Sequence, residues 1–212
     1  MRHCLVLFDL DGTLIDHFGA IHRCHAFAMR QVGLPEPTPA QVRAAVGGGL
    51  EHAIARLAGP DNVATVLPHY LAHWKETMLD DVVPLPGAGD LLTAIRAASG
   101  RSAVLTNKRG DAARAVCAHL GLTPLLAGII GAGDTPWLKP DRALTFQVLA
   151  GLGSTPGEAC YVGDSPFDIA TAREAGLPFY GVTTGTHHET ELRAAGAENV
   201  FPGLPELQAA LA

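Results

Sequence analysis

From residue 100 onward the sequence repeats one pattern: a short apolar run, a few polar turn residues, and a segment with the length and spacing of a helix. The apolar runs are, in chain order, residues 102–105, 127–130, 159–162, 178–182 and 199–201. The helices expected after them cover about 111–120, 141–149, 167–175 and 189–195, with a last helix ending near Leu211. Strands that alternate with helices form a parallel sheet covered on both faces. The pattern therefore predicts an α/β fold with a doubly wound parallel sheet.

Another apolar run, residues 5–8, leads directly into two aspartates, Asp9 and Asp11. We predict a buried first strand here, because the run is short and wholly apolar. Its carboxyl end is where open α/β sheets place their ligand crevices. Two carboxylates about 4 Å apart repel each other by roughly 4 kcal/mol at an effective dielectric constant near 20. A bound cation would offset that repulsion, so the pair indicates a cation site.

Residues 17–82 break this rhythm, because they show helical spacing and almost no strand signal. Turn residues interrupt them at 33–35, 47–49 and 59–61. We therefore predict an all-helical cap domain over 17–82, inserted into a core domain made of 1–16 and 83–212. The chain would cross between the two near Asp16 and Val83, which makes these positions a natural hinge.

Composition excludes several classes of protein. The chain has 212 residues, 48% of them hydrophobic and 17% charged, which supports a packed core. A net charge of −6 without a basic stripe argues against nucleic acid as a partner. No apolar stretch approaches the ~20 residues that span a bilayer, and no signal peptide precedes the first strand. The four cysteines form no C-x-x-C pair, which favours reduced thiols. We expect a soluble cytoplasmic protein, monomeric or homodimeric.

Polar side chains with catalytic potential follow the predicted strands. They are Asp9 and Asp11, Thr106 and Asn107, Lys139, and Asp164 and Asp168. Because parallel strands end at the same edge of a sheet, these residues should converge. Carboxylates in an oxygen-rich surrounding suit Mg²⁺, which binds few carboxylates together with water and substrate phosphate. The set therefore indicates phosphoryl transfer, in which catalysis is mostly positioning and charge neutralisation.

These residues lie in four ordered motifs, FDLDGTLID, LTNK, LKPD and GDSPFD. With them the sequence resembles the haloacid dehalogenase superfamily, and within it the phosphoglycolate phosphatase-like members with a helical cap of the C1 type. The likeness covers nearly the whole chain. It implies a Mg²⁺-dependent phosphatase that hydrolyses a small phosphate monoester through an aspartyl-phosphate intermediate. The substrate it implies is 2-phosphoglycolate or a similar metabolite.

The resemblance also implies a role for each catalytic residue. Asp9 would be the nucleophile that attacks phosphorus, and Asp11 would protonate the leaving oxygen and then activate water. Thr106 would bind a phosphoryl oxygen, with help from the backbone N–H of Asn107. Lys139 would offset the charge of the nucleophile and the phosphate.

The resemblance implies a metal site as well. Asp164 and Asp168 would hold Mg²⁺ together with Asp9 and the backbone carbonyl of Asp11. Four carboxylates against Lys139 leave a charge of −3, which would repel a phosphate dianion, and the metal brings it to −1. Binding of substrate without Mg²⁺ is therefore expected to be poor.

Substrate contacts from outside the four motifs are harder to predict. The glycines at 47–49 form the most permissive backbone of the cap, and Gly48 is a candidate to bring a bare N–H close to a substrate anion. A flexible turn between helices is the other interpretation. His187 and His188 follow the predicted strand 178–182 on the active-site edge, where a substrate contact or a plain loop is expected.

Two other functions share parts of this pattern. A phosphosugar mutase of the same superfamily keeps both aspartates and uses a cap histidine, and His22 lies one residue out of register with that position. A receiver-type signalling domain also combines acidic residues, a hydroxyl, a lysine and Mg²⁺ on a doubly wound sheet. Its phosphoacceptor belongs on the third strand, however, where this chain has the apolar residues 127–130. A dehalogenase is disfavoured, because that chemistry has no alkoxide for Asp11 to protonate.

Overall fold

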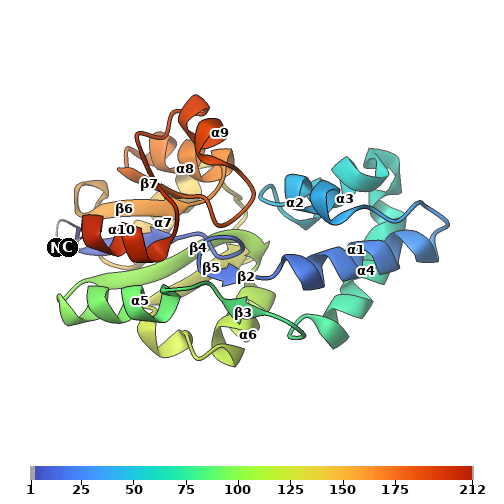
Figure 1. Ribbon diagram of the computed structural model, residues 1–212, viewed down its shortest axis with the longest axis horizontal. Helices are drawn as coiled ribbons and strands as arrows, with labels where there is room; N and C mark the ends of the chain where they lie inside the picture. The colour runs from blue at the N-terminus through green and yellow to red at the C-terminus, as the bar shows by residue number, and fades with distance from the viewer. Residues whose placement is uncertain (1–2, 212) are drawn as a thin grey trace.

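The computed structural model describes residues 3–211, in which a parallel sheet carries a helical insertion at one end (Figure 1). All neighbouring strands of this sheet pair in parallel. Across the sheet the order is β5 (Gly128–Ala132), β4 (Arg101–Arg109), β1 (Leu5–Phe8), β6 (Ala159–Gly163), β7 (Phe179–Val182) and β8 (Asn199–Phe201). The parallel sheet expected from the repeated pattern is therefore confirmed.

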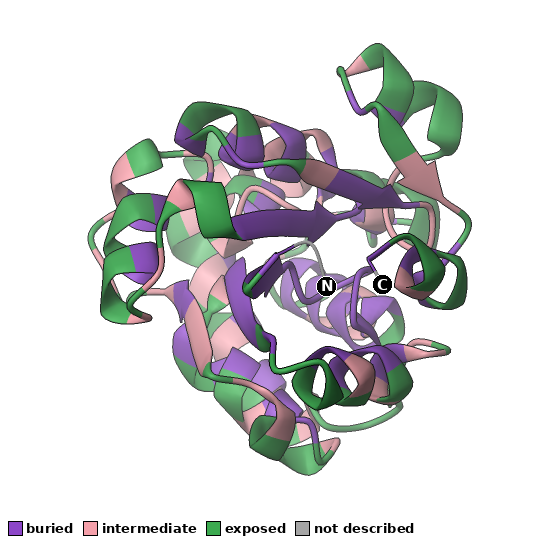
Figure 2. Ribbon diagram, turned by 90° about the vertical axis from the view of Figure 1, so that its left-hand side faces the viewer, coloured by how far each residue is buried: buried purple, intermediate pink, exposed green. Residues whose placement is uncertain are grey.

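Helices cover both faces of the sheet, and buried strands lie between them (Figure 2). Along β1, Val6 and Phe8 face one helical layer, and Leu5 and Leu7 face the other, as the two-residue period of a strand requires. The first layer contains α5 (Ala88–Ala97), α6 (Gly110–His119) and α10 (Leu204–Leu211). The second contains α7 (Arg142–Gly151) and α8 (Pro166–Ala175), and α9 (Glu189–Ala194) packs beside α8. The doubly wound fold is thus confirmed.

The order of the strands places a crevice at the end of β1. The chain continues from β1 to β4 and β5 on one side, and then to β6, β7 and β8 on the other. Such a reversal of strand order opens a crevice at the carboxyl ends of the two strands beside it. Those strands are β1 and β6, and Asp9 and Asp164 follow them directly.

The insertion consists of α1 (Phe18–Gln31), α2 (Pro39–Ala45), α3 (Leu50–Ala58) and α4 (Val63–Thr77). Its helices pack through their own apolar cluster, which also includes Ala112 of α6. Where the chain leaves and re-enters the sheet region, β2 (Ile15–Asp16) pairs with β3 (Val83–Pro84) in antiparallel fashion. This clasp lies at the expected crossing points. That 17–82 forms a separate domain stays a prediction.

Strand β4 differs most in length from the sequence expectation. β4 continues past Leu105 to Arg109, with an irregular register between these two residues, because Arg109 still pairs with Ala132 of β5. The polar residues in between hide this extension in the sequence. Short helical turns cover Pro60–Asn62, Thr123–Leu125 and Pro156–Glu158.

Two further observations concern the class of protein. All four cysteines are free, and three of them are buried. Within residues 3–211, no helix has both the length and the apolar character needed to cross a membrane.

Candidate active site

The GDSPFD motif forms a helix start that presents two carboxylates. Ser165 caps α8, Pro166 occupies its first turn, and Asp168 is the third helical residue. Asp168 Oδ2 accepts hydrogen bonds from the Ser165 backbone N–H (3.0 Å) and hydroxyl (2.6 Å). This cap fixes Asp168 in one orientation, with its other oxygen free to face the centre of the site.

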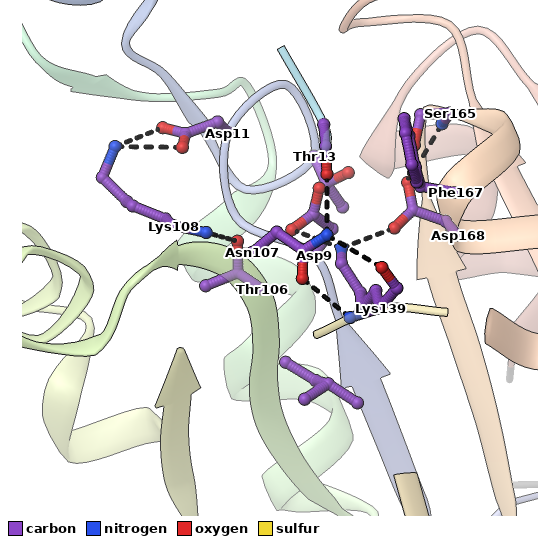
Figure 3. A network of polar contacts seen from close by, with 12 residues as sticks. Asp9, Asp11, Thr13, Thr106, Asn107, Lys108, Lys139, Ser165, Phe167 and Asp168 are labelled. Atoms are coloured by element: carbon purple, nitrogen blue, oxygen red, sulfur yellow. Dashed lines mark hydrogen bonds and ion pairs between the residues drawn. The ribbon is translucent and has the colours of Figure 1, made fainter. Parts of the chain in front are cut away.

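Lys139 joins the two sides of this centre. Its Nζ lies 2.7 Å from Asp168 Oδ1 and 2.9 Å from Asp9 Oδ1, so that one ammonium bridges two buried carboxylates (Figure 3). Burial acts to lower the pKa of Lys139, but Asp168 and Asp9 outweigh it and hold the pKa well above the usual value. Lys139 therefore remains a cation at physiological pH.

Asp9 is the least satisfied member of the cluster. Its Oδ1 has an ion pair with Lys139 but no hydrogen bond of suitable geometry among the described residues. Burial raises the pKa of Asp9 to about 6; Lys139 acts against this rise and Asp168 adds to it. A buried oxygen that lacks a hydrogen bond is open to a further electropositive partner.

Asp164 lies close to Asp9 and Asp168 and is held by threonines from distant loops. Its Oδ1 accepts a hydrogen bond from the Thr13 hydroxyl (3.1 Å), and its Oδ2 accepts two from Thr186. Gly12 makes this close packing feasible, because it turns with φ +84° and a Cβ there would lie 2.9 Å from Asp164 Oδ2. Burial, followed by repulsion from Asp168 and Asp9, raises the pKa of Asp164 to about 7.

The donor set fits a hard divalent cation. Asp9, Asp164 and Asp168 each offer a carboxylate oxygen, and these oxygens lie within 4.8 Å of one another. The buried oxygen of Asp9 without a hydrogen bond is open to such a cation. Carboxylate oxygens are the ligands that Mg²⁺ prefers. This group is therefore a candidate metal site.

Asp11 faces away from this group and contacts a lysine that sequence reasoning left without a role (Figure 3). Lys108 Nζ lies 3.0 and 2.9 Å from the two oxygens of Asp11 and 4.7 Å from the ring centre of Trp74. His17 Nδ1 lies 3.4 Å from Asp11 Oδ1, beyond hydrogen-bond geometry. Burial would raise the pKa of Asp11, but Lys108 and His17 outweigh it and hold that pKa well below its usual range.

Lys108 also changes the charge expected for the site. Four carboxylates against two buried ammonium groups leave a formal charge of −2, and a divalent cation would bring it to zero. Lys108 is the last residue of the LTNK motif. Its position directly after Thr106 and Asn107 could have indicated from the sequence that it belongs to the site. His17 had no comparable signal.

Thr106 and Asn107 lie between the centre of the site and the insertion. Thr106 Oγ1 accepts a hydrogen bond from the Lys108 backbone N–H (3.2 Å). The Asn107 amide donates to the carbonyls of Gly47 (3.0 Å) and Lys139 (3.1 Å). Asn107 therefore ties the glycine turn of the insertion to the loop that carries Lys139.

A cavity of about 80 Å³ separates the sheet edge from the insertion. From the sheet side it is lined by Asp9, Asp11, Thr106, Asn107, Lys108, Arg109 and Ala112. From the insertion it is lined by Ile21, His25, Val46, Gly47, Gly49, Leu50, Ala53, Tyr70, Leu71 and Trp74. Lys139, Asp164 and Asp168 lie behind Asp9, outside this lining.

Three candidate substrate contacts, Gly48, His187 and His188, are also absent from the cavity lining. A Cβ on Gly48 would meet the His52 ring at 2.5 Å, whereas its neighbours Gly47 and Gly49 border the cavity. His187 accepts or donates a hydrogen bond with Thr186, and His188 caps α9. The role of Gly48 in substrate binding stays a prediction.

The carboxylate cluster predicts that the metal-free protein loses stability as pH rises. The pKa values of Asp9 and Asp164, about 6 and 7, exceed the unfolded value near 4. Their protonated forms therefore stabilise the fold fully below about pH 4, and this stabilisation is lost as pH rises through 6 to 7. The expected loss is on the order of a few kcal/mol, since one pKa unit is about 1.4 kcal/mol and the two carboxylates titrate as a coupled pair.

Thermal unfolding in chelator at pH 5 and pH 8 tests this expectation. Other groups also titrate, so the comparison is with Asp164→Asn, which removes one of the two carboxylates. The variant should gain stability relative to the wild type as pH rises, and Mg²⁺ should reduce the wild-type loss at pH 8. A difference between the two proteins that does not change with pH would contradict the expectation.

Comparison with known proteins gives one consistent result. Residues 6–182 match the sequence profile of the haloacid dehalogenase-like hydrolases. A phosphoglycolate phosphatase of Rhodospirillum rubrum is 32% identical over 95% of this chain and 88% of that protein. One from Rhodobacter capsulatus is 34% identical, with 94% of each covered. The crystal structure of a predicted phosphoglycolate phosphatase from Haemophilus somnus has the same fold, with a TM-score of 0.92 at 22% identity over 100% of this chain and 99% of that one.

Proposed function

Because the chain belongs to the haloacid dehalogenase-like hydrolase family and is similar to its phosphoglycolate phosphatases, we propose that it hydrolyses a small phosphate monoester through a phosphorylated Asp9. The main support for this proposal is the environment of the Asp9 side chain. Its carboxylate borders the cavity, its Oδ1 has no hydrogen bond, and a buried lysine stands behind it. A nucleophile needs this combination of access and nearby positive charge.

The reaction would proceed in two displacements. First, an oxygen of Asp9 forms a bond to phosphorus while the bond from phosphorus to the ester oxygen breaks, and Asp11 gives a proton to the departing oxygen. Second, Asp11 takes a proton from water, whose oxygen attacks phosphorus, and inorganic phosphate leaves with Asp9 restored. Beside Lys108 and His17 the pKa of Asp11 lies well below its usual range, so in this arrangement Asp11 carries no proton to give. Asp11 would therefore have to turn from Lys108 and take up a proton from water before it serves the leaving oxygen.

The remaining residues would position the phosphoryl group and balance its charge. Thr106 and Asn107 border the cavity, as Asp9 does, and the Thr106 hydroxyl and the Asn107 backbone N–H would bind phosphoryl oxygens. Lys139 would offset the charge that Asp9 and the phosphate share. Asp9, Asp164, Asp168 and the Asp11 carbonyl would hold Mg²⁺, which when bound neutralises charge on the phosphoryl oxygens and on these carboxylates.

We propose 2-phosphoglycolate as the first substrate to test, on the likeness to phosphatases of that name. The experiment is a screen of small phosphate esters with Mg²⁺, in which released phosphate is measured per mole of protein. Many turnovers are expected. A receiver-type domain would release at most one phosphate per chain, so a stoichiometric burst without turnover would overturn the phosphatase proposal.

The placement of His22 favours a phosphatase over a phosphosugar mutase. Its Nε2 donates to the carbonyl of Pro37 (2.9 Å), inside the insertion, and His22 is outside the described lining of the cavity. A cap histidine that served a mutase would have to reach the sugar. The screen includes a hexose phosphate, for which we expect no isomer to form.

Asp11→Asn should lower kcat by roughly 10²- to 10⁴-fold, the usual contribution of a general acid and base. Phosphoryl binding depends on other residues, so the affinity for inorganic phosphate should change little. The change also leaves the buried Lys108 ammonium without its partner, so a lower melting temperature is expected. Asp16→Asn is the matched control, because asparagine still accepts the Phe18 N–H bond. Loss of phosphate binding in Asp11→Asn would contradict the assigned role.

A further inference from the structure

The cavity accepts only a small leaving group. Its volume of about 80 Å³ is well below the roughly 300–1,000 Å³ of sites that hold drug-sized ligands. Asp9 borders it at one side, and helices α1, α3 and α4 form the opposite wall. With the phosphoryl group at Asp9, the remaining space fits a few heavy atoms.

The wall from the insertion brings no charge to that leaving group. Its members are mainly aliphatic or aromatic, and Tyr70 and Trp74 stack at 5.6 Å. The one titratable nitrogen base in this wall is His25, and burial lowers its pKa to about 4, which leaves it neutral at physiological pH. A charged side chain that recognises the leaving group therefore has to come from the sheet side.

On the sheet side, Lys108 is the cation that the geometry makes available. The cavity also borders Arg109, but that guanidinium is half exposed and bonded to Asp111. Lys139 lies behind Asp9 and bridges two carboxylates. The Lys108 side chain is only 7% exposed and sits between Asp11 and Trp74, at the cavity lining.

A carboxylate on the leaving group would suit this ammonium. If Asp11 turns to the departing oxygen, Lys108 loses its partner while still buried, which is costly unless another anion replaces it. An ammonium has three donors, and the same site already holds one that bridges two carboxylates, Lys139. Lys108 can therefore bind a substrate carboxylate beside Asp11 and keep that partner when Asp11 turns away.

We propose that Lys108 is a specificity-determining residue that binds a carboxylate on the leaving group. The enzyme would then prefer phosphate esters of short hydroxy acids to phosphate esters of similar size whose leaving group is uncharged. This inference rests on the proposed phosphatase function and names its substrate class. The test compares kcat/KM for 2-phosphoglycolate and ethyl phosphate, which differ in the carboxylate.

Wild-type protein should prefer 2-phosphoglycolate, and Lys108→Gln should reduce that preference by roughly ten- to hundred-fold, mainly through KM. Glutamine keeps an N–H donor for Asp11, so the variant is expected to fold. Lys108→Arg, which keeps the charge, should retain most of the preference. Lys75→Gln, an exposed lysine on α4, is the matched control and should behave as wild type.

An unchanged preference in Lys108→Gln would overturn the inference. If the preference stays unchanged because both substrates lose kcat/KM equally, Lys108 only positions Asp11. Binding to Asp9→Asn, measured by calorimetry without turnover, gives an independent readout: 2-phosphoglycolate should bind more tightly than ethyl phosphate, and equal affinities would also refute the proposal.

Failure of the inference is distinguishable from failure of the proposed function. If both esters are hydrolysed with many turnovers but the carboxylate brings no advantage, the phosphatase stands and the assignment of Lys108 falls. If neither ester nor any other in the screen is hydrolysed, the proposed function falls, and the inference with it.

Discussion

Asp9→Asn should lower kcat by roughly 10⁴-fold or more, since no covalent intermediate can form on an amide. The fold should survive, because asparagine has nearly the same shape and Lys139 keeps its ion pair with Asp168. Removal of a carboxylate whose pKa burial raises to about 6 even favours folding above that pH. The measurements are phosphate release under saturating substrate, far-UV circular dichroism and the melting temperature.

Asp90→Asn is the control for this experiment, because Asp90 is an exposed carboxylate on α5, outside the four motifs. It should retain wild-type kcat. More than about one per cent of wild-type kcat in Asp9→Asn, in a preparation free of contaminating phosphatase, would remove Asp9 from the role of nucleophile.

Removal of divalent cations should abolish activity, at least a hundred-fold, and Mg²⁺ should restore it. The physical reason is the formal charge of −2 on a site that must bind a phosphate dianion. Ca²⁺ should inhibit, because it takes more ligands at about 2.3–2.6 Å, against about 2.0–2.1 Å for Mg²⁺, and so disturbs the in-line geometry. The measurement is the rate in EDTA, followed by titration with each cation.

A variant of a proposed metal ligand distinguishes specific binding of Mg²⁺ at the site from a general effect of salt on activity. Asp164→Asn should raise the Mg²⁺ concentration needed for half-maximal activity, whereas Asp61→Asn, an exposed aspartate of the insertion, should not. Full activity of the wild type in EDTA, after dialysis that removes tightly bound metal, would show that the carboxylate cluster serves another purpose.

Much of the site was predictable because it follows from strand order. Asp9 and Asp164 come directly after β1 and β6, and the parallel pairing of these strands brings both to one edge. Asp168 follows from a local rule as well, since a capping residue and a proline at the helix start place the third residue beside the strand end. Lys139 precedes α7 at the same edge.

The contacts of Asp11 were not predictable in the same way. Lys108 lies 97 residues from it in the chain, and Trp74 reaches Lys108 only because α4 folds back over the sheet edge. Strand periodicity and turn chemistry describe neighbours within a few residues, and they do not encode where the insertion rests. The same limit applies to Gly48, whose neighbours and not itself border the cavity.

By itself, therefore, the sequence determined the sheet, the helical insertion and the set of catalytic candidates, because hydrophobic period and strand-end chemistry are local properties. Only the tertiary structure decided that Asp9, Asp164 and Asp168 share a centre and that Asp11 pairs with Lys108 away from it. It also decided how small and apolar the cavity between the sheet edge and the insertion is. Those features depend on the packing of α1, α3 and α4 against the ends of β1 and β4. Such packing is the sum of many weak contacts between distant segments, which no short stretch of sequence records.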